Sequence, residues 1–416
     1  MLLGALHMDM KRRVKQAAKL LGIKGKLKKA QSKAINDGLN GHDLLVIAPT
    51  SFGKSAVFQI LALLKGGLSI VVVPTLSLLH DQAERLQQLG LQAEILASDC
   101  DLLCEEDICE IIRQYGHLIL YTTPESLWKL ELLHTPVSLL IADECHCVVS
   151  WGYGFRKDYL KIGIYLEQLN TRPQVIALTA TAPLEDRKQI EKLLHMRHVK
   201  EHVVSLYRPK LTFSTYSFVS EEARQKKLKH LLKKHMDDSD GACIIYCNIK
   251  KNAKAVYELV KTWYPKQAAI CHSNLSNGER RQNERAFMTG ERRIMVATSA
   301  FGMGINKSDV RLVVHYNLPL SLVDYYQQAG RGARDGGKAR CVLLYKKSDY
   351  DVNRYVIEQN QTQDALNYAL NALDRMKEYA DSNDGCMVQR LLSALGEELE
   401  TPCGRCTCCQ KARRQR

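Results

Sequence analysis

The chain has 416 residues, enough for two or three domains with complete cores, and its 59 lysines and arginines against 45 acidic residues give a formal net charge of +14. This charge favours a polyanionic partner, although a solvated basic face is the alternative explanation. The sequence lacks the apolar stretch of a membrane span or secretory signal, and fourteen cysteines in so long a chain are more typical of metal sites or buried thiols than of disulfides. We therefore expect a soluble intracellular protein, in the nucleus of a eukaryote or the cytoplasm of a bacterium or archaeon.

The first half of the chain alternates short apolar runs with helical patterns. This alternation is typical of a parallel β-sheet covered by helices. The expected strands comprise residues 44–48, 69–73, 93–96, 118–121, 138–142 and 175–178.

The segment APTSFGKS, residues 48–55, is typical of a phosphate-binding loop. An apolar run leads into it and a helical pattern begins at Ser55, so backbone amides and the helix N-terminus converge on a phosphate. Lys54 adds a positive charge for the β- and γ-phosphates, and the hydroxyl of Ser55 is suited to bind magnesium. Thr50 and Gly53 complete the expected nucleotide-binding loop.

An acidic pair follows the apolar run 138–142. Asp143 lies at the end of this expected strand, where it is suited to hold the metal, and Glu144 beside it is suited to polarise the attacking water. His146 completes the run Asp-Glu-Cys-His and is counted among the expected catalytic residues. The loop and the acidic pair together predict a site that hydrolyses a nucleotide with magnesium.

The second half of the chain repeats the strand and helix alternation but has no phosphate loop of its own, so we expect it to complete the first site. Pro209 marks the joint between the halves, since proline interrupts helices and strand ladders. We expect domains at residues 1–207, 208–346 and 347–416, the last one helical. The expected strands of the second domain comprise residues 242–246, 268–271, 293–297, 312–316 and 340–345.

Cysteines gather near the end of the chain. Cys403, Cys406 and Cys409 follow the spacing Cys-x-x-Cys-x-x-Cys, and Cys386 lies upstream, so four thiolates are available for a tetrahedral ion. Zinc is the expected metal and an iron–sulfur cluster is the alternative. Cys408 is an extra thiol that competes with Cys409 for the place of fourth ligand.

Three further segments resemble, in order and spacing, the motor motifs of superfamily two helicases: TAT (179–181), ATSAFGMGINK (297–307) and QQAGRGARDG (327–336). The aromatic-rich run HCVVSWGYGFR (146–156) is similar to a loop of RecQ-type DNA helicases. The resemblance implies two RecA-like parallel-sheet domains in tandem followed by a small helical zinc-binding subdomain. It also implies ATP-dependent DNA unwinding with translocation from 3′ to 5′. Many family members continue into winged-helix and HRDC domains, which are absent from this sequence.

The resemblance extends to individual residues of the nucleotide site. It implies that Arg331 and Arg334 reach the γ-phosphate, with Arg334 the first choice, although this chain has Gly332-Ala333 where the family has Ala-Gly. Gln31 resembles the glutamine that reads the adenine edge.

DNA contacts are also implied by the resemblance. Trp151, Phe155 and Arg156 belong to the expected coupling loop, where aromatic rings stack on bases. The alternative is that both aromatic residues lie in the core. Further candidates are Ser77, Gln82, Asn248 and Arg280.

The resemblance, with the residues that carry it, implies the partner and the cofactors. We expect a monomer that binds single-stranded and duplex or branched DNA and uses ATP, magnesium and zinc. Two other interpretations are an RNA helicase or non-unwinding remodeller, and a nucleic-acid-binding module without catalysis.

Overall fold

The computed structural model describes residues 9–50, 52–98, 103–131, 133–150, 157–299, 301, 307–360 and 363–414. The chain divides into two units, Met1–Ser205 and Leu206–Arg416. In the part of the chain that is described, no helix has the length and apolarity needed to cross a membrane.

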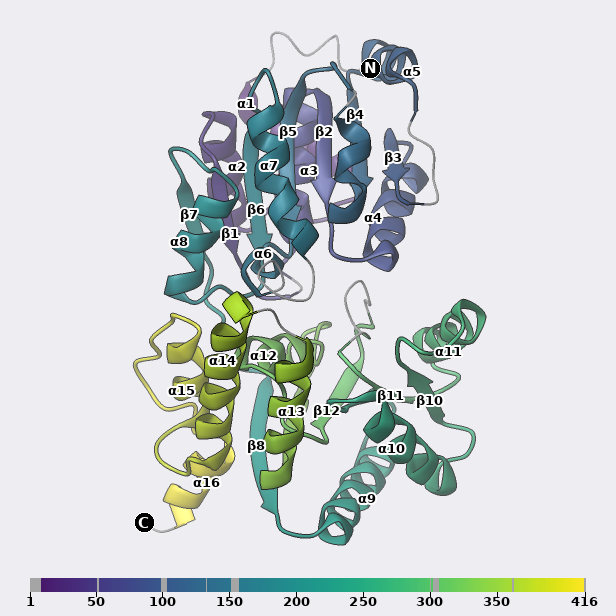
Figure 1. Ribbon diagram of the computed structural model, residues 1–416, viewed down its shortest axis with the longest axis vertical. Coiled ribbons are helices and arrows are strands. Elements are labelled where there is room, and N and C mark those ends of the chain that lie inside the picture. Colours follow the sequence, from purple (N-terminus) through teal and green to yellow (C-terminus); the bar gives the residue numbers. More distant parts are fainter. Residues whose placement is uncertain are drawn as a thin grey trace. The chain divides into compact units, whose positions relative to one another are not determined.

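The first unit is built on a parallel sheet of seven strands in the order β3-β4-β2-β5-β6-β1-β7 (Figure 1). Buried apolar runs form its inner strands, because a parallel sheet with helices on both faces leaves neither face to water. The strand at one edge, β7, is mostly exposed and pairs only with β1. The bounds are β1 (Leu44–Ile47), β2 (Gly67–Val72), β3 (Ala93–Leu96), β4 (His117–Thr122), β5 (Val137–Asp143), β6 (Gln174–Thr179) and β7 (Lys200–Val203).

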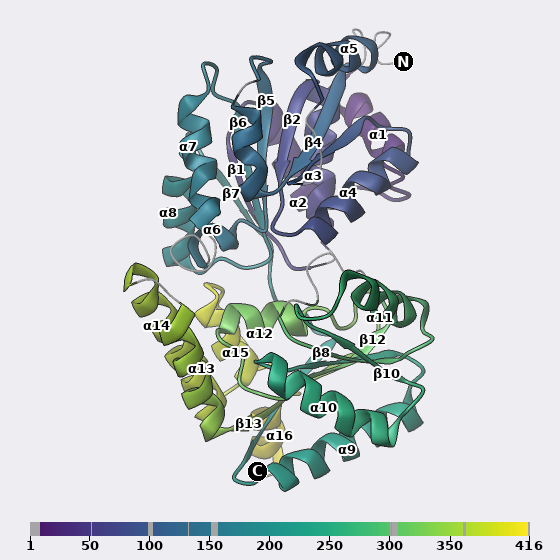
Figure 2. The same cartoon turned by 45° about the vertical axis from the view of Figure 1, so that its right-hand side comes forward.

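Helices cover both faces of this sheet, and Figure 2 shows α7 and α3 on opposite sides of it. On the α3 side, Ile35, Phe58 and Leu61 pack with Val46 and Ile141 into one core. The helices are α1 (Met10–Leu20), α2 (Lys29–Leu39), α3 (Lys54–Lys65), α4 (Leu76–Gln88), α5 (Glu105–Tyr115), η1 (Pro124–Leu130), α6 (His146–Ser150), η2 (Lys157–Leu160), α7 (Lys161–Gln168) and α8 (Leu184–Leu193).

The second unit has a parallel sheet of six strands in the order β10-β11-β9-β12-β13-β8. Its edge strand β8 pairs with β13 along eight residues, from Leu211 opposite Ala339 to Phe218 opposite Lys346. The bounds are β8 (Leu211–Phe218), β9 (Ala242–Tyr246), β10 (Ala268–Cys271), β11 (Ile294–Ala297), β12 (Val310–His315) and β13 (Ala339–Lys346).

The carboxy-terminal helices pack on the second unit. Helices α14 and α15 contact α12, and α16 contacts β8 (Figure 1). The backbone N–H of Leu206 donates to Glu397 at 2.5 Å, and Arg405 donates to the Tyr207 hydroxyl at 3.3 Å. The helices of this unit are α9 (Glu221–Asp238), α10 (Lys250–Trp263), α11 (Asn277–Thr289), α12 (Leu322–Ala329), α13 (Lys347–Asn360), α14 (Gln363–Asp381), α15 (Met387–Ala394) and α16 (Thr407–Arg414).

Two buried histidines make the second unit sensitive to acid. Burial lowers the pKa of His315 to about 3 and that of His235 to about 4, whereas an unfolded histidine titrates near 6.5. The unfolded chain therefore binds more protons below about pH 6.5, and the free energy of unfolding should fall by up to about 1.4 kcal/mol per histidine for each pH unit.

Denaturant unfolding at about pH 7.5 and about pH 5 measures this loss. The Nε2–H group of His235 donates to the Gly241 carbonyl at 3.0 Å, so His235→Gln keeps a donor there and should flatten the pH dependence. His230 lies on the same helix but is exposed, and His230→Gln should leave the pH dependence as it is. If the free energy of unfolding changes equally with pH in the parent and in both variants, buried His235 is not a source of the acid sensitivity.

Candidate nucleotide site and zinc cluster

The phosphate loop joins β1 to α3 in the first unit. Gly53 has φ of 86°, a left-handed conformation that favours glycine, and Lys54 begins the helix directly after it. The Lys54 ammonium donates to the Ala48 carbonyl at 3.2 Å, across the loop. The residues thus combine a helix N-terminus, a lysine and the hydroxyl of Ser55, which is the donor set that binds nucleotide phosphates.

Gln31 lies against this loop, as expected for a residue of the nucleotide site. Its amide nitrogen donates to the carbonyls of Phe52 at 3.2 Å and Gly53 at 3.0 Å, and its oxygen accepts from the Lys28 backbone at 2.8 Å. The Lys28 ammonium also donates to the Phe52 carbonyl and lies 4.7 Å from the centre of the Phe52 ring. Recognition of adenine by Gln31 stays a prediction.

The acidic pair lies where the sequence predicts it, at the end of the central strand β5. Asp143 is buried, and its two carboxylate oxygens accept hydrogen bonds from the Glu144 N–H at 3.0 Å and from Gln82 at 2.8 Å. Burial and the neighbouring Glu144 raise the pKa of Asp143 to about 6, while the charge of Lys54 acts in the opposite direction. The phosphate loop follows β1 and the acidic pair ends β5, and both strands pair in parallel with β6, so the two segments lie at the same edge of the sheet.

The backbone of Glu144 departs from strand geometry. Its φ is 50°, which is uncommon for a residue with a side chain, and strained backbone of this kind is enriched at active sites. Its carboxylate lies 3.4 Å from Nδ1 of His146.

His146 connects the acidic pair to the next strand. Its Nδ1 lies 3.0 Å from the Thr179 hydroxyl, which itself donates to the Thr181 carbonyl at 2.9 Å. Because the only hydroxyl proton of Thr179 is used in that bond, His146 carries its proton on Nδ1 and donates it. The TAT segment is thereby linked to the acidic pair.

The residues predicted to contact DNA are dispersed over both units. The Gln82 amide donates to Asp143, a contact that the sequence did not indicate.

The other candidates make contacts of their own. The Asn248 amide donates to Asn353, and the Asn252 amide donates to Asn248, both at 2.8 Å. Ser77 is partly exposed on α4, and Arg280 pairs with Glu284 at 3.2 Å on α11. Trp151, Phe155 and Arg156 lie outside the described residues, so the coupling loop stays a prediction.

The expected arginines follow α12 in the second unit. Burial raises the pKa of the nearby strand residue Tyr246, and the charges of Arg331 and Arg334 act in the opposite direction. Ala333 between them has φ of 56°. The action of either arginine on a nucleotide stays a prediction.

The carboxy-terminal cysteines form a cluster suited to a metal. The Sγ atoms of Cys386, Cys403, Cys406 and Cys409 all lie within 4.8 Å of one another, and those of Cys386 and Cys406 are 4.0 Å apart. Backbone N–H groups donate to three of these sulfurs, at 3.2 to 3.5 Å. Tetrahedral zinc with bonds of about 2.3 Å needs sulfurs at such separations, so the residues fit a structural zinc site.

The extra thiol is not part of this cluster. Cys408 is buried next to the cluster, but the four-sulfur group contains Cys409 instead. Consecutive residues of a helix point about 100° apart, and both cysteines lie in α16, so only one of them faces the other three. Cys409 is therefore the fourth ligand candidate.

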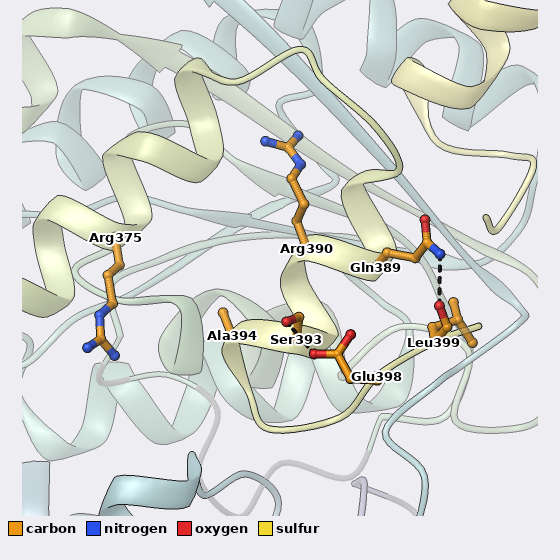
Figure 3. A pocket seen from close by; sticks show the side chains of 7 residues that line it. All are labelled: Arg375, Gln389, Arg390, Ser393, Ala394, Glu398 and Leu399. Carbon is orange, nitrogen blue, oxygen red and sulfur yellow. Dashed lines mark hydrogen bonds between the residues drawn. The ribbon is translucent and has the colours of Figure 1, made fainter. Parts of the chain in front are cut away.

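A surface hollow of about 500 Å³ lies between α14, α15 and the segment that follows α15 (Figure 3). Several of its polar side chains already make hydrogen bonds within the protein. Gln389 donates to the Leu399 carbonyl at 2.8 Å, and Ser393 donates to Glu398 at 2.6 Å. The guanidinium groups of Arg375 and Arg390 point away from one another in Figure 3. This hollow contains none of the predicted site residues, and we assign no ligand to it.

Family models match three consecutive parts of the chain. They are the DEAD/DEAH box helicase model at residues 28–190, the helicase conserved C-terminal domain at 223–336 and the RecQ zinc-binding model at 347–410. Among solved structures, yeast Dbp5 bound to RNA and ADP BeF3 has a TM-score of 0.66 at 16% identity, covering 94% of this chain and 99% of that one. Fold and site together define a helicase core with two RecA-like domains and a helical zinc-binding region.

Curated relatives narrow this class. The ATP-dependent DNA helicase RecQ of Bacillus subtilis is 34% identical over 374 residues, which are 88% of this chain and 61% of the relative. A second protein of Bacillus subtilis, described as "Probable ATP-dependent DNA helicase RecS", is 31% identical over 84% of this chain and 71% of its own length. The chain belongs to the RecQ helicase family. It spans about three fifths of the length of the RecQ relatives, at 60% to 61%.

Proposed function

We propose that this chain is an ATP-dependent DNA helicase, which translocates on single-stranded DNA from 3′ to 5′ and unwinds duplex or branched DNA. The observation that carries the proposal is the arrangement of the first unit, where the phosphate loop with Lys54 follows β1 and Asp143 ends β5, two parallel strands that both pair with β6. Membership of the RecQ family supports DNA as the substrate. We also propose that the chain acts as a monomer inside the cell.

The residues of the first unit have distinct roles in hydrolysis. Lys54 binds the β- and γ-phosphates, and Ser55 and Asp143 hold magnesium. The metal, when bound, neutralises charge that develops on the phosphate oxygens. Glu144 takes a proton from the attacking water, and His146 orients the Glu144 carboxylate through their 3.4 Å contact.

Gln82 holds Asp143 in place. Its amide donates to the carboxylate oxygen that does not accept from the Glu144 N–H, so both oxygens of Asp143 are fixed before a metal arrives. Gln82 lies on α4, the helix that also carries Ser77. We propose that contact between α4 and a DNA strand changes the position of Asp143 through Gln82, which couples strand binding to hydrolysis.

Strand displacement on matched DNA and RNA duplexes with single-stranded overhangs tests the proposed function. We expect the chain to separate DNA duplexes with a 3′ overhang only when ATP and magnesium are present, and Lys54→Ala to separate none. Displacement of the RNA duplex at an equal or higher rate would favour an RNA helicase instead. ATP hydrolysis without displacement of either duplex would indicate a remodeller that does not unwind.

A further inference from the structure

Arg208, at the start of the second unit, makes hydrogen bonds to the loop that carries Arg331 and Arg334. Arg208 donates through Nη1 to the Gly330 carbonyl at 2.5 Å, and through Nη2 to the carbonyls of Gly332 at 2.8 Å and Ala333 at 2.9 Å. The sequence indicates only a joint between domains at this position. In the structure, one guanidinium group spans the backbone on both sides of Arg331.

These carbonyls lie directly after the carboxyl end of α12, and that of Ala333 also accepts from the Gly336 N–H at 3.2 Å. The last carbonyls of a helix have no partner within the helix, and a cation there is favoured by the helix dipole. The backbone N–H groups of the loop are already used, since Gly330 donates to Tyr326, Gly332 to Ala329 and Ala333 to Val310. Arg208 donates to the carbonyls of the same three residues, and its planar donors reach all three acceptors at once.

Arg208 is itself fixed to the sheet. Its carbonyl accepts from the Leu211 N–H at 3.0 Å, and Leu211 opens β8, where it pairs with Ala339 of β13. The following residue, Pro209, restricts the backbone further. Because the backbone of Arg208 is anchored at the start of β8, its guanidinium group ties the backbone of residues 330–333 to the edge of the sheet.

The order Gly332-Ala333 makes this support necessary. A Cβ atom at position 332 would lie 2.9 Å from the Cβ of Ala339, so glycine is required there. Ala333 has to adopt the left-handed conformation, with φ of 56°, in which L-residues other than glycine are strained. The hydrogen bond from Arg208 to the Ala333 carbonyl opposes the relaxation of that strain.

We propose that Arg208 is a positioning residue, which fixes the backbone of residues 330–333 and so the orientation of the Arg331 and Arg334 side chains. This inference rests on the proposed function, because it assumes that these arginines serve ATP hydrolysis. Arg208 itself touches no nucleotide in the proposal. Its effect passes through the backbone of residues 330–333.

Steady-state ATPase measurements on Arg208 variants test the proposal. Arginines that stabilise transferring phosphoryl groups are worth about 10³-fold or more in kcat, so a misdirected loop in Arg208→Gln should lower kcat by at least about tenfold. The KM for ATP should stay within about twofold, because the phosphate loop in the first unit is unchanged. Arg208→Lys keeps the charge but reaches fewer carbonyls, and its kcat should be intermediate.

Arg293→Gln is the matched control, since Arg293 also donates to a backbone carbonyl of the second unit, that of Ser239, away from the arginine loop. Both glutamine variants should lower the melting temperature, but only Arg208→Gln should lower kcat per folded molecule. Loss of kcat in proportion to folded protein, in both variants alike, would show a structural role only and overturn the proposal.

A combined variant shows whether Arg208 acts through the two loop arginines. Arg331→Ala with Arg334→Ala should lower kcat strongly, and adding Arg208→Gln should lower it by less than about twofold more, because both displaced side chains are already gone. If adding Arg208→Gln instead multiplies the loss in kcat, the proposal is overturned. If Arg334→Ala and Lys54→Ala both keep parental turnover, the proposed function fails as well; if they lose turnover while Arg208→Gln keeps it, only the role of Arg208 fails.

Discussion

Replacing Glu144 with Gln should reduce the kcat for ATP hydrolysis by at least about 100-fold, the lower bound for removal of a general base. The amide keeps the size of the side chain but does not take a proton from water. ATP should still bind, because Lys54, Ser55 and Asp143 are unchanged. Phosphate release gives kcat, and binding of a fluorescent ATP analogue gives the affinity.

Glu167→Gln provides the control for this experiment. Glu167 also lies next to a histidine, with its carboxylate 3.3 Å from His195, but this pair is solvent-exposed and remote in sequence from the acidic pair. Its turnover should match that of the parent. If Glu144→Gln hydrolyses ATP within about threefold of the parent rate, Glu144 is not the general base.

Replacing Cys406 with Ser should remove zinc and unfold the carboxy-terminal subdomain. Cys406 is fully buried in the four-sulfur cluster, and a structural zinc site in a small domain contributes about 10 kcal/mol or more to folding. The expected phenotype is insolubility, or rapid proteolysis within residues 380–416. Elemental analysis and limited proteolysis measure both effects.

Cys408→Ser is the matched control, because Cys408 is a buried neighbour outside the cluster. It should retain about one zinc per chain and resist proteolysis like the parent. Cys409→Ser should behave like Cys406→Ser. A folded, metal-free parent protein, or one with iron–sulfur colour, would contradict the zinc assignment.

Most strands could be predicted because parallel strands in the middle of a covered sheet are continuous apolar runs. The two missed strands are edges. In β7, the sequence KEHV has a single buried residue and pairs only with β1. In β8, polar and apolar residues alternate and only Leu211 and Phe213 are buried, so no apolar run marks it.

The site could be predicted where its residues are neighbours in sequence, as in the phosphate loop and the acidic pair. Contacts between segments that are far apart in the sequence could not be predicted. Gln82 is 61 residues from Asp143, and Arg208 is 122 to 125 residues from the carbonyls it holds. A single sequence shows that an arginine precedes a proline, but the partner of its guanidinium group depends on how β8 pairs with β13. The choice between Cys408 and Cys409 likewise needed the orientation of α16.

Phosphate release with and without single-stranded DNA, in the parent protein and in Lys54→Ala, tests most directly whether the first unit houses the motor site. The parent should hydrolyse ATP at a rate that single-stranded DNA raises at least about tenfold, because strand contact is proposed to set the position of Asp143. Lys54→Ala should release no phosphate above background while its binding of single-stranded DNA stays near that of the parent. Equal turnover in both proteins, or turnover that DNA leaves unchanged, would contradict an ATP-driven DNA motor built on Lys54, Asp143 and Glu144.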